Sequence, residues 1–409
     1  FREKIIKLKV KLFGLLPWQV KRKALYTEHG PAIETPHGIY AIRYAGMGEV
    51  KQIEQWLAMN KATNFEEWLA ALAQHTFASF NFVYSDKDGN IAFIHNSMTP
   101  VRIPGYNWHN YLPGDKSSLI WDSYISFEQL PIVINPSSGY LISANQSPFF
   151  VTSDKDNPDR KNYSNEDGFP TRMTNRAVRG LELLSELDKI DERTFSAIKH
   201  DKKYSKNSRA YKYLEKAMLA DLEDLNTQKH EIYANAQTIL KKWDLSTDKN
   251  NRGAALGTCI IGAEWLAEQQ GENPPDPSGE LKRCTDLLLD KIGRIDPKWG
   301  EVNRHIRGEI NVALGGGPDT LRAIYGLGLE EKGYLTNIAG DGLYYLVSWD
   351  KDKKQKVLGI HQFGSATLDE NSPHYADQAL DFANEILHDP LFDANKRQQK
   401  LDRRYRPGQ

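Results

Sequence analysis

Apolar and polar residues alternate along the first third of the chain and predict strands there, because successive side chains of a strand point to opposite faces. In FNFVYSDKDGNIAFIHN (80–96), an Asp-Gly-Asn turn at 88–90 separates two such runs and predicts a β-hairpin. Residues 49–75 instead repeat apolar positions at helical spacing, with Asn64 as a candidate N-cap. The other runs that favour strands are 3–26, 38–46 and 138–148.

The period changes to three and four residues between Thr174 and Ile292, which predicts a helical middle of the chain. Strand patterns return at GLYYLVSWD (342–350) and KVLGIHQFG (356–364), before a closing helical pattern at 374–387. A basic tail poor in apolar residues follows and is expected on the surface. The five helical patterns of the middle cover 175–187, 210–225, 231–243, 254–269 and 280–292.

This order of elements predicts one α+β portion over residues 1–409 rather than a series of separable domains. Residues 1–173 are expected to be mainly strands with one helical segment, and residues 174–292 form the helical segment. Residues 293–409 are expected to hold the returning strands, the closing helix and the tail. No linker rich in Pro, Gly and Ser divides the chain.

Composition excludes several classes of protein. Hydrophobic residues make up 40% of the chain, which is far from the signature of disorder. Lys and Arg number 53 against 54 Asp and Glu, so no basic excess is present to bind nucleic acid independently of sequence. The apolar runs are interrupted well short of the roughly 20 residues that a membrane-spanning helix requires, so no membrane span is expected.

The chain contains two cysteines, Cys259 and Cys284, which lack the paired spacing of a zinc site. Each lies in one of the predicted helices. A disulfide between adjacent helices and two buried thiols both fit the sequence, because the Cα separation that decides between them is not visible in it.

The run SGYLISANQSPF places Asn145 just after an apolar stretch. A side-chain amide there is suited to stabilising an oxyanion, since its dipole is fixed in advance and carries no charge that titrates. The alternative is a turn asparagine that hydrogen-bonds its own backbone.

Several further segments carry motifs that resemble one family. They are TEHGPAI (27–33), YAIRYAG (40–46), FNFVYSDKDGNIAFIHN (80–96), the run 111–149, IDPKWGEVNRHIRG (295–308), LGGGPDTLRA (314–323) and HQFGSATLDENSPHYADQ (361–378). In this order they resemble the β subunit of the penicillin acylase family of N-terminal nucleophile hydrolases, particularly its acyl-homoserine lactone and aculeacin A acylase branch. The resemblance covers the downstream portion of that subunit. It implies a four-layer αββα fold, partial in this chain.

The resemblance also implies two site residues. Asn145 matches the asparagine that forms part of the family's oxyanion hole, and Arg176 matches the arginine at the start of the next helix. Arg176 is expected to orient Asn145 by hydrogen bonding through its planar guanidinium. Arg172 and Arg179 are the competing matches, and a solvated helix arginine is the alternative role.

The family's reaction needs a Ser, Thr or Cys at the N-terminus of the β subunit, and Phe1 is none of these. We therefore expect the nucleophile outside this chain, with the remaining β-subunit segment and the α subunit of the same precursor as partners. The implied activity is hydrolysis of an N-acyl amide, of an acyl-homoserine lactone or another long-chain amide. The alternatives are a β-lactam amide acylase, and a non-catalytic acylase-like binding protein or inactive truncated product.

Other motifs are assigned to the scaffold. The glycines at 315–317 favour a tight turn over a phosphate cradle, with Asp319 as N-cap of a following helix. His29 is expected to pack or orient, and a catalytic role for the 374–377 segment is not favoured. The acidic loop at 154–160 offers oxygen ligands for Ca²⁺, but a solvated loop is preferred and no metal or other cofactor is assigned.

The resemblance finally implies a location. Members of the family are typically exported, so a periplasmic or secreted protein is expected. A bridge between Cys259 and Cys284 would agree with an oxidising compartment.

Overall fold

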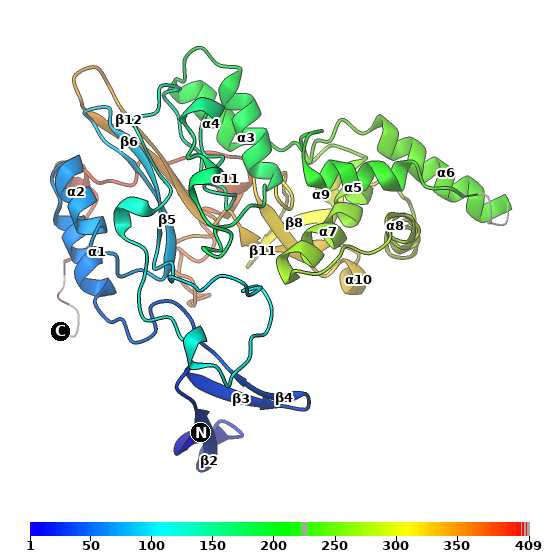
Figure 1. Ribbon diagram of the computed structural model, residues 1–409. Helices are drawn as coiled ribbons and strands as arrows, with labels where there is room; N and C mark the ends of the chain where they lie inside the picture. Colours follow the sequence, from blue (N-terminus) through cyan, green and yellow to red (C-terminus); the bar gives the residue numbers. More distant parts are fainter. Residues whose placement is uncertain (223–226, 402, 405, 407–409) are drawn as a thin grey trace. The chain divides into compact units, whose positions relative to one another are not determined.

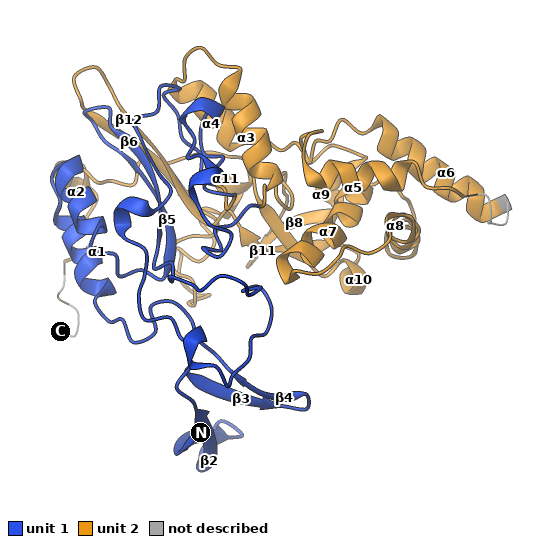
Figure 2. Cartoon of the chain, in the orientation of Figure 1, with its two compact units in different colours: residues 1–143, 147–171 blue, residues 144–146, 172–409 orange. Residues whose placement is uncertain are grey.

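The computed structural model describes residues 1–222, 227–401, 403, 404 and 406 (Figure 1). The chain divides into two compact units, shown in different colours in Figure 2. Unit 1 consists of residues 1–143 and 147–171, and unit 2 of residues 144–146 and 172–409.

An antiparallel sheet in the order β1-β2-β3-β4 opens unit 1. Its first two strands pair along their whole length, from Arg2 opposite Tyr26 to Leu12 opposite Leu16. The turn between them uses Phe13 and Gly14, both at positive φ. The strands expected in the first 26 residues are thus confirmed, and β1 is exposed throughout. The four strands are β1 (Arg2–Leu12), β2 (Leu16–Tyr26), β3 (Pro31–Thr35) and β4 (Gly38–Ala41).

The second sheet of unit 1 packs against two helices. The predicted hairpin is present, with β5 and β6 antiparallel, and β7 pairs with the other edge of β6. The predicted N-cap is confirmed as well, since Asn64 Oδ1 accepts a hydrogen bond of 2.8 Å from the amide of Glu67. The aromatic rings of Trp68, Phe82 and Tyr84 lie in the core between helices and sheet. The elements are α1 (Gln52–Lys61), α2 (Phe65–Leu72), β5 (Ser79–Ser85), β6 (Ile91–Ser97) and β7 (Ile132–Ile134).

The strand expected over 138–148 does not form. Gly139 is at positive φ, and the stretch has both a backbone and a side-chain partner, since the amide of Ile142 donates to the carbonyl of Val151 at 2.8 Å. The carbonyl of Tyr140 accepts from Thr152 Oγ1 at 2.9 Å, and the Ser138 and Thr152 hydroxyls are 2.5 Å apart. Because hydroxyl groups and the Val151 carbonyl satisfy this backbone locally, it needs no ladder.

The helical middle is confirmed in the described residues of unit 2, where each of the five predicted patterns forms a helix and α4 (Glu192–Lys199) adds one that was not predicted. Their core contains Trp243, whose indole packs so closely against Gly253 and Gly257 that neither position has room for a Cβ. The helix α5 is shorter than the pattern at 210–225 predicts, because Gln237 Nε2 donates to the carbonyls of Ala217 and Ala220 at its end. Residues 223–226 of that pattern lie outside the described residues. The helices are α3 (Asn175–Ser185), α4 (Glu192–Lys199), α5 (Arg209–Met218), α6 (Thr227–Lys242), α7 (Ala254–Gln270) and α8 (Pro277–Ile292).

The two cysteines are joined in a disulfide that links α7 to α8. The Cα atoms of Cys259 and Cys284 are 5.9 Å apart, within the range that a bridge needs. The sequence left this pairing open, and the structure decides for it.

Two small sheets follow in unit 2, one in the order β10-β11-β8-β9 and one formed by the pair β12-β13. The strands expected at 342–350 and 356–364 are therefore confirmed. The strands are β8 (Asn303–Arg307), β9 (Ile310–Ala313), β10 (Ile324–Leu327), β11 (Leu335–Gly340), β12 (Leu343–Trp349) and β13 (Gln355–His361). The short helices around them are α9 (Trp299–Val302), α10 (Leu329–Lys332), α11 (Ala379–Ala383) and α12 (Ala394–Gln399).

The closing helix is shorter than its sequence pattern. Only α11 forms within 374–387, because Gln378 is tied to the end of β13: its amide bonds the carbonyl of Phe363, and its side chain accepts from the amide of His361. The described residues of the tail are exposed as expected, and they include part of the short helix α12, which begins after the N-cap Asp393.

No helix in the described residues is both long and apolar enough to cross a bilayer.

Candidate functional site

Asn145 belongs to unit 2 and stands exposed between two buried neighbours. Its backbone has φ of +61°, a left-handed conformation that asparagine tolerates better than most residues. The carbonyl of Ala144 accepts a 2.9 Å hydrogen bond from Thr174 Oγ1, and the same hydroxyl accepts from the amide of Ala177 as the N-cap of α3. The start of α3 therefore anchors the segment that carries Asn145.

Arg176 contacts Asn145 directly. Its Nη2 donates a hydrogen bond of 3.0 Å to Asn145 Oδ1 across 31 residues of sequence. A guanidinium only donates hydrogen bonds, so the amide must turn its oxygen toward Arg176. The Nδ2 group, which carries the two amide hydrogens, then points away from Arg176. The structure thus brings the two predicted site residues together.

Asp319 holds the other side of Arg176. One carboxylate oxygen accepts from Arg176 Nε at 3.2 Å, and the other accepts from the backbone amide of Asn175 at 2.7 Å. The carbonyl of Asp319 also accepts from Asn175 Nδ2 at 2.7 Å. Asp319 therefore caps the first turn of α3 and pairs with the arginine that contacts Asn145.

The helix expected after Asp319 does not form, and this corrects the N-cap assigned from the sequence. The chain makes a turn there and enters β10, while the carboxylate caps α3, 144 residues earlier in the sequence. The tight turn expected at 315–317 lies slightly later, because the amide of Thr320 donates to the carbonyl of Gly317 and the turn residues are 318 and 319. The sequence drew attention to Asp319 only because it is an acid that follows a run of glycines. That position does not show that its partner is the start of α3.

Burial dominates the electrostatics of Asp319, which is 3% exposed. Loss of hydration raises the pKa of its carboxyl, and this outweighs the opposing effects of the Arg176 charge and of the hydrogen bonds from Asn175 and Arg176. The Arg176 side chain retains 24% of its exposure, so the pair lies at the edge of the buried region.

The two competing arginines have other partners. Arg172 lies 3.3 Å from a carboxylate oxygen of Glu268, and Arg179 makes ion pairs with Asp201 at 3.1 Å and Glu182 at 3.8 Å. Neither contacts Asn145 through a hydrogen bond in the described residues. The geometry therefore favours Arg176 among the three.

The other histidines singled out in the sequence take local contacts. His29 lies in the turn before β3, where its Nε2 is 3.1 Å from the carbonyl of Gly114. His374 Nδ1 is 2.8 Å from a carboxylate oxygen of Asp377, and both side chains are largely exposed. The neighbouring Tyr375 ring packs under the guanidinium of Arg307.

The acidic loop at 154–160 uses its carboxylates internally. Asp156 accepts hydrogen bonds from Ser137 Oγ at 2.8 Å and Ser153 Oγ at 3.1 Å, and Asp159 caps a short turn of helix. Within the described ranges, no three His, Cys, Asp or Glu side chains gather closely enough to hold a metal ion.

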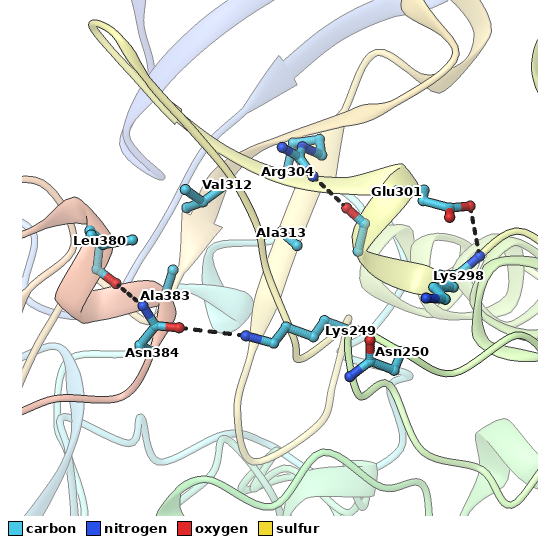
Figure 3. Close-up of a pocket in the computed structure, with 11 residues that line it drawn as sticks. Lys249, Asn250, Lys298, Glu301, Arg304, Val312, Ala313, Leu380, Ala383 and Asn384 are labelled. Atoms are coloured by element: carbon cyan, nitrogen blue, oxygen red, sulfur yellow. Dashed lines mark hydrogen bonds between the residues drawn. The ribbon is translucent and has the colours of Figure 1, made fainter.

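Two cavities within unit 2 do not include Asn145 among their lining residues. One, of about 360 Å³, is lined by Lys249, Lys298 and Arg304, none of which forms an ion pair in the described part of the chain (Figure 3). The Lys249 amine donates to Asn384 Oδ1 at 3.5 Å. The other cavity, of about 440 Å³, is mainly apolar and is lined in part by Pro318, the residue before Asp319.

Comparisons with known proteins agree on one family. A family model described as Penicillin amidase matches residues 2–399. The chain is similar to Penicillin G acylase of Escherichia coli, with 33% identity over 126 residues, which covers 30% of this chain and only 15% of that protein. It is also similar in structure to the thermostable Penicillin G acylase from Alcaligenes faecalis, with a TM-score of 0.63 and 16% identity over 99% of this chain and 81% of that chain. The expected mixed α+β fold class is thereby confirmed.

Proposed function

The chain belongs to the penicillin amidase family, and from this premise we propose that it contributes the oxyanion-binding part of an enzyme that hydrolyses N-acyl amides. The observation that carries the proposal is the Arg176–Asn145 hydrogen bond of 3.0 Å. It turns an uncharged donor, Asn145 Nδ2, away from Arg176 at an exposed position. Such a donor is what an oxyanion requires, because it stabilises developing charge without having to lose a proton.

The reaction would proceed through an acyl-enzyme. An N-terminal Ser, Thr or Cys from a segment outside this chain attacks the acyl carbonyl, while its α-amine takes the proton. The carbonyl oxygen becomes an oxyanion, to which Asn145 Nδ2 donates. The C–N bond then breaks, the amine leaves with a proton, and water releases the acid in a second addition and elimination. Asn145 stabilises both tetrahedral intermediates.

The finer assignments belong to the same proposal. The chain is the downstream portion of the β subunit, within a four-layer αββα fold completed by the remaining β-subunit segment and the α subunit of one precursor. The substrate is an acyl-homoserine lactone or another long-chain acyl amide. The location is periplasmic or secreted, and the disulfide between α7 and α8 supports an oxidising compartment.

The test begins with mass spectrometry and N-terminal sequencing of every polypeptide in the purified protein. A companion that starts with Ser, Thr or Cys is expected. The complex is then assayed on a long-chain acyl-homoserine lactone and on a phenylacetyl amide. Hydrolysis of the first in preference supports the proposed substrate, and preference for the second favours a β-lactam amide acylase. A complex that binds either amide without cleaving it refutes hydrolysis.

A further inference from the structure

A buried carboxylate stands behind the Arg176–Asn145 pair, and no motif in the sequence assigns it a part in the reaction. We propose that Asp319 is a positioning residue that fixes Arg176 and, through it, the orientation of the Asn145 amide. This inference rests on the proposed function, because it concerns how the oxyanion donor is aimed.

The need for such positioning follows from the amide itself. A side-chain amide has nearly the same shape when its oxygen and nitrogen are exchanged, and the exchanged form would present an acceptor to the oxyanion. Arg176 breaks this symmetry because it accepts no hydrogen bonds. An arginine that kept 24% of its exposure and had no anchor could swing into water and release the amide.

Asp319 holds Arg176 in place through a property of its carboxylate, which offers two hydrogen-bond acceptors and no donor. Its two oxygens face two donors, Arg176 Nε at 3.2 Å and the amide of Asn175 at 2.7 Å. An amide in the same place would have to turn its NH₂ group toward one of these donors. A buried donor that faces another donor is unsatisfied, so Asp319→Asn must release either the arginine or the first turn of α3.

Hydrogen bonds hold the backbone on both sides of Asp319. Asp319 has φ of +56°, and the turn is held by Thr320, whose amide bonds the carbonyl of Gly317 and whose hydroxyl accepts from the Gly317 amide at 3.1 Å. Tyr204 OH donates to the carbonyl of Pro318 at 2.6 Å. A left-handed residue held by bonds on both sides is typical of a position whose strain the fold maintains for function.

The experiment is a double-mutant cycle of Asp319→Asn and Arg176→Gln in the complete processed complex, measured as kcat and KM for the amide that the wild-type complex hydrolyses. We expect Asp319→Asn to lower kcat by up to roughly 10²-fold with little change in KM, since a small misplacement of the donor acts on the transition state. On the Arg176→Gln background, the same change should cost less than about 3-fold, because Asp319 acts through the arginine.

The matched control is Asp341→Asn. Asp341 is another aspartate of unit 2 that pairs with two cations, Lys199 at 2.7 Å and Arg322 at 2.9 Å, without contact to Asn145. It should lower thermal stability and leave kcat of the folded enzyme unchanged. If Asp319→Asn does not fold, Arg176→Lys is the second variant, because a single ammonium cannot bridge Asp319 and Asn145 as the planar guanidinium does.

The outcomes separate the two claims. A wild-type complex without amidase activity overturns the proposed function and this inference with it. An active wild type in which Asp319→Asn or Arg176→Lys keeps its kcat overturns the positioning role alone. Losses from Asp319→Asn and Arg176→Gln that multiply in the double variant also overturn it, since they would mean that Asp319 acts on stability or on another group.

Discussion

Replacing Asn145 by aspartate removes the Nδ2 donor while disturbing the fold less than replacement by alanine does. Asp tolerates φ of +61°, whereas alanine would add a cost of about 1–2 kcal/mol for the left-handed backbone. The carboxylate keeps an oxygen for Arg176 Nη2, 3.0 Å away in the native protein, and loses only the Nδ2 donor. The residue is exposed, so the free energy of unfolding should change by no more than about 0.5 kcal/mol.

The effect on catalysis should be far larger. Loss of one oxyanion donor typically lowers kcat by ~10²- to 10³-fold, which corresponds to about 2.7–4 kcal/mol of transition-state stabilisation. The new negative charge would also repel the oxyanion, which places Asn145→Asp at the upper end of that range. The assay is kcat and KM on the hydrolysed amide, with thermal denaturation of the same samples to establish folding.

Asn135 offers a matched control. It is another asparagine at positive φ, 48°, and its Oδ1 accepts from the amide of Ile91 at 2.8 Å. Asn135→Asp makes the same chemical change under similar backbone strain but should leave kcat at the wild-type value. The reasoning is refuted if Asn145→Asp folds normally and retains kcat within about threefold of wild type, because a donor to the oxyanion is worth much more than that.

Three predictions concern stability, each measured by denaturant or thermal unfolding. Replacing both disulfide cysteines by serine should cost about 3.5 kcal/mol for a loop of 25 residues and leave kcat unchanged, and a variant as stable as wild type would contradict this. Burial lowers the pKa of His95 to about 4, so as the pH falls the unfolded chain takes up a proton near pH 6.5, before the folded chain does. The free energy of unfolding should therefore fall by about 3 kcal/mol between pH 6.5 and pH 4. In His95→Gln this pH dependence should be much weaker. Gly257→Ala should destabilise α7 because its Cβ would overlap the Trp243 ring, whereas Gly262→Ala in the same helix meets nothing within 4 Å and should add up to about 1 kcal/mol.

Features that depend only on residues close together in the sequence were predictable from it. The hairpin at 80–96 needs only its turn and its alternation, and the Asn64 cap needs only the residue three positions later. The predicted strand at 138–148 did not form: Ile142 bonds the backbone of Val151 and Tyr140 bonds the hydroxyl of Thr152, and no ladder of backbone bonds follows from these contacts. The strand propensity of a segment indicates that its backbone prefers to be extended, but it does not indicate which groups will accept or donate its hydrogen bonds.

The two residues of the candidate site could be proposed from the sequence only through the family resemblance. It indicated Asn145 and Arg176, and the structure then brought them within hydrogen-bond distance. Asp319 could not be found in this way, because its partner lies 144 residues away and the local pattern suggested a helix of its own. A buried acid shows its role only when the donors around it are known, and these donors come from the start of α3.

The assignment of residues 144–146 to unit 2 limits how this protein can be recombined. The covalent chain passes from one unit to the other at three peptide links, 143–144, 146–147 and 171–172. A single proteolytic cut cannot release either unit intact, and a chimera that exchanged one unit for that of a relative would need three junctions. Two of those junctions lie within two residues of Asn145. Exchange of unit 2 at these three junctions would keep Asn145 and Arg176 from the same parent, although 25 residues of unit 1, 147–171, lie between them in the chain.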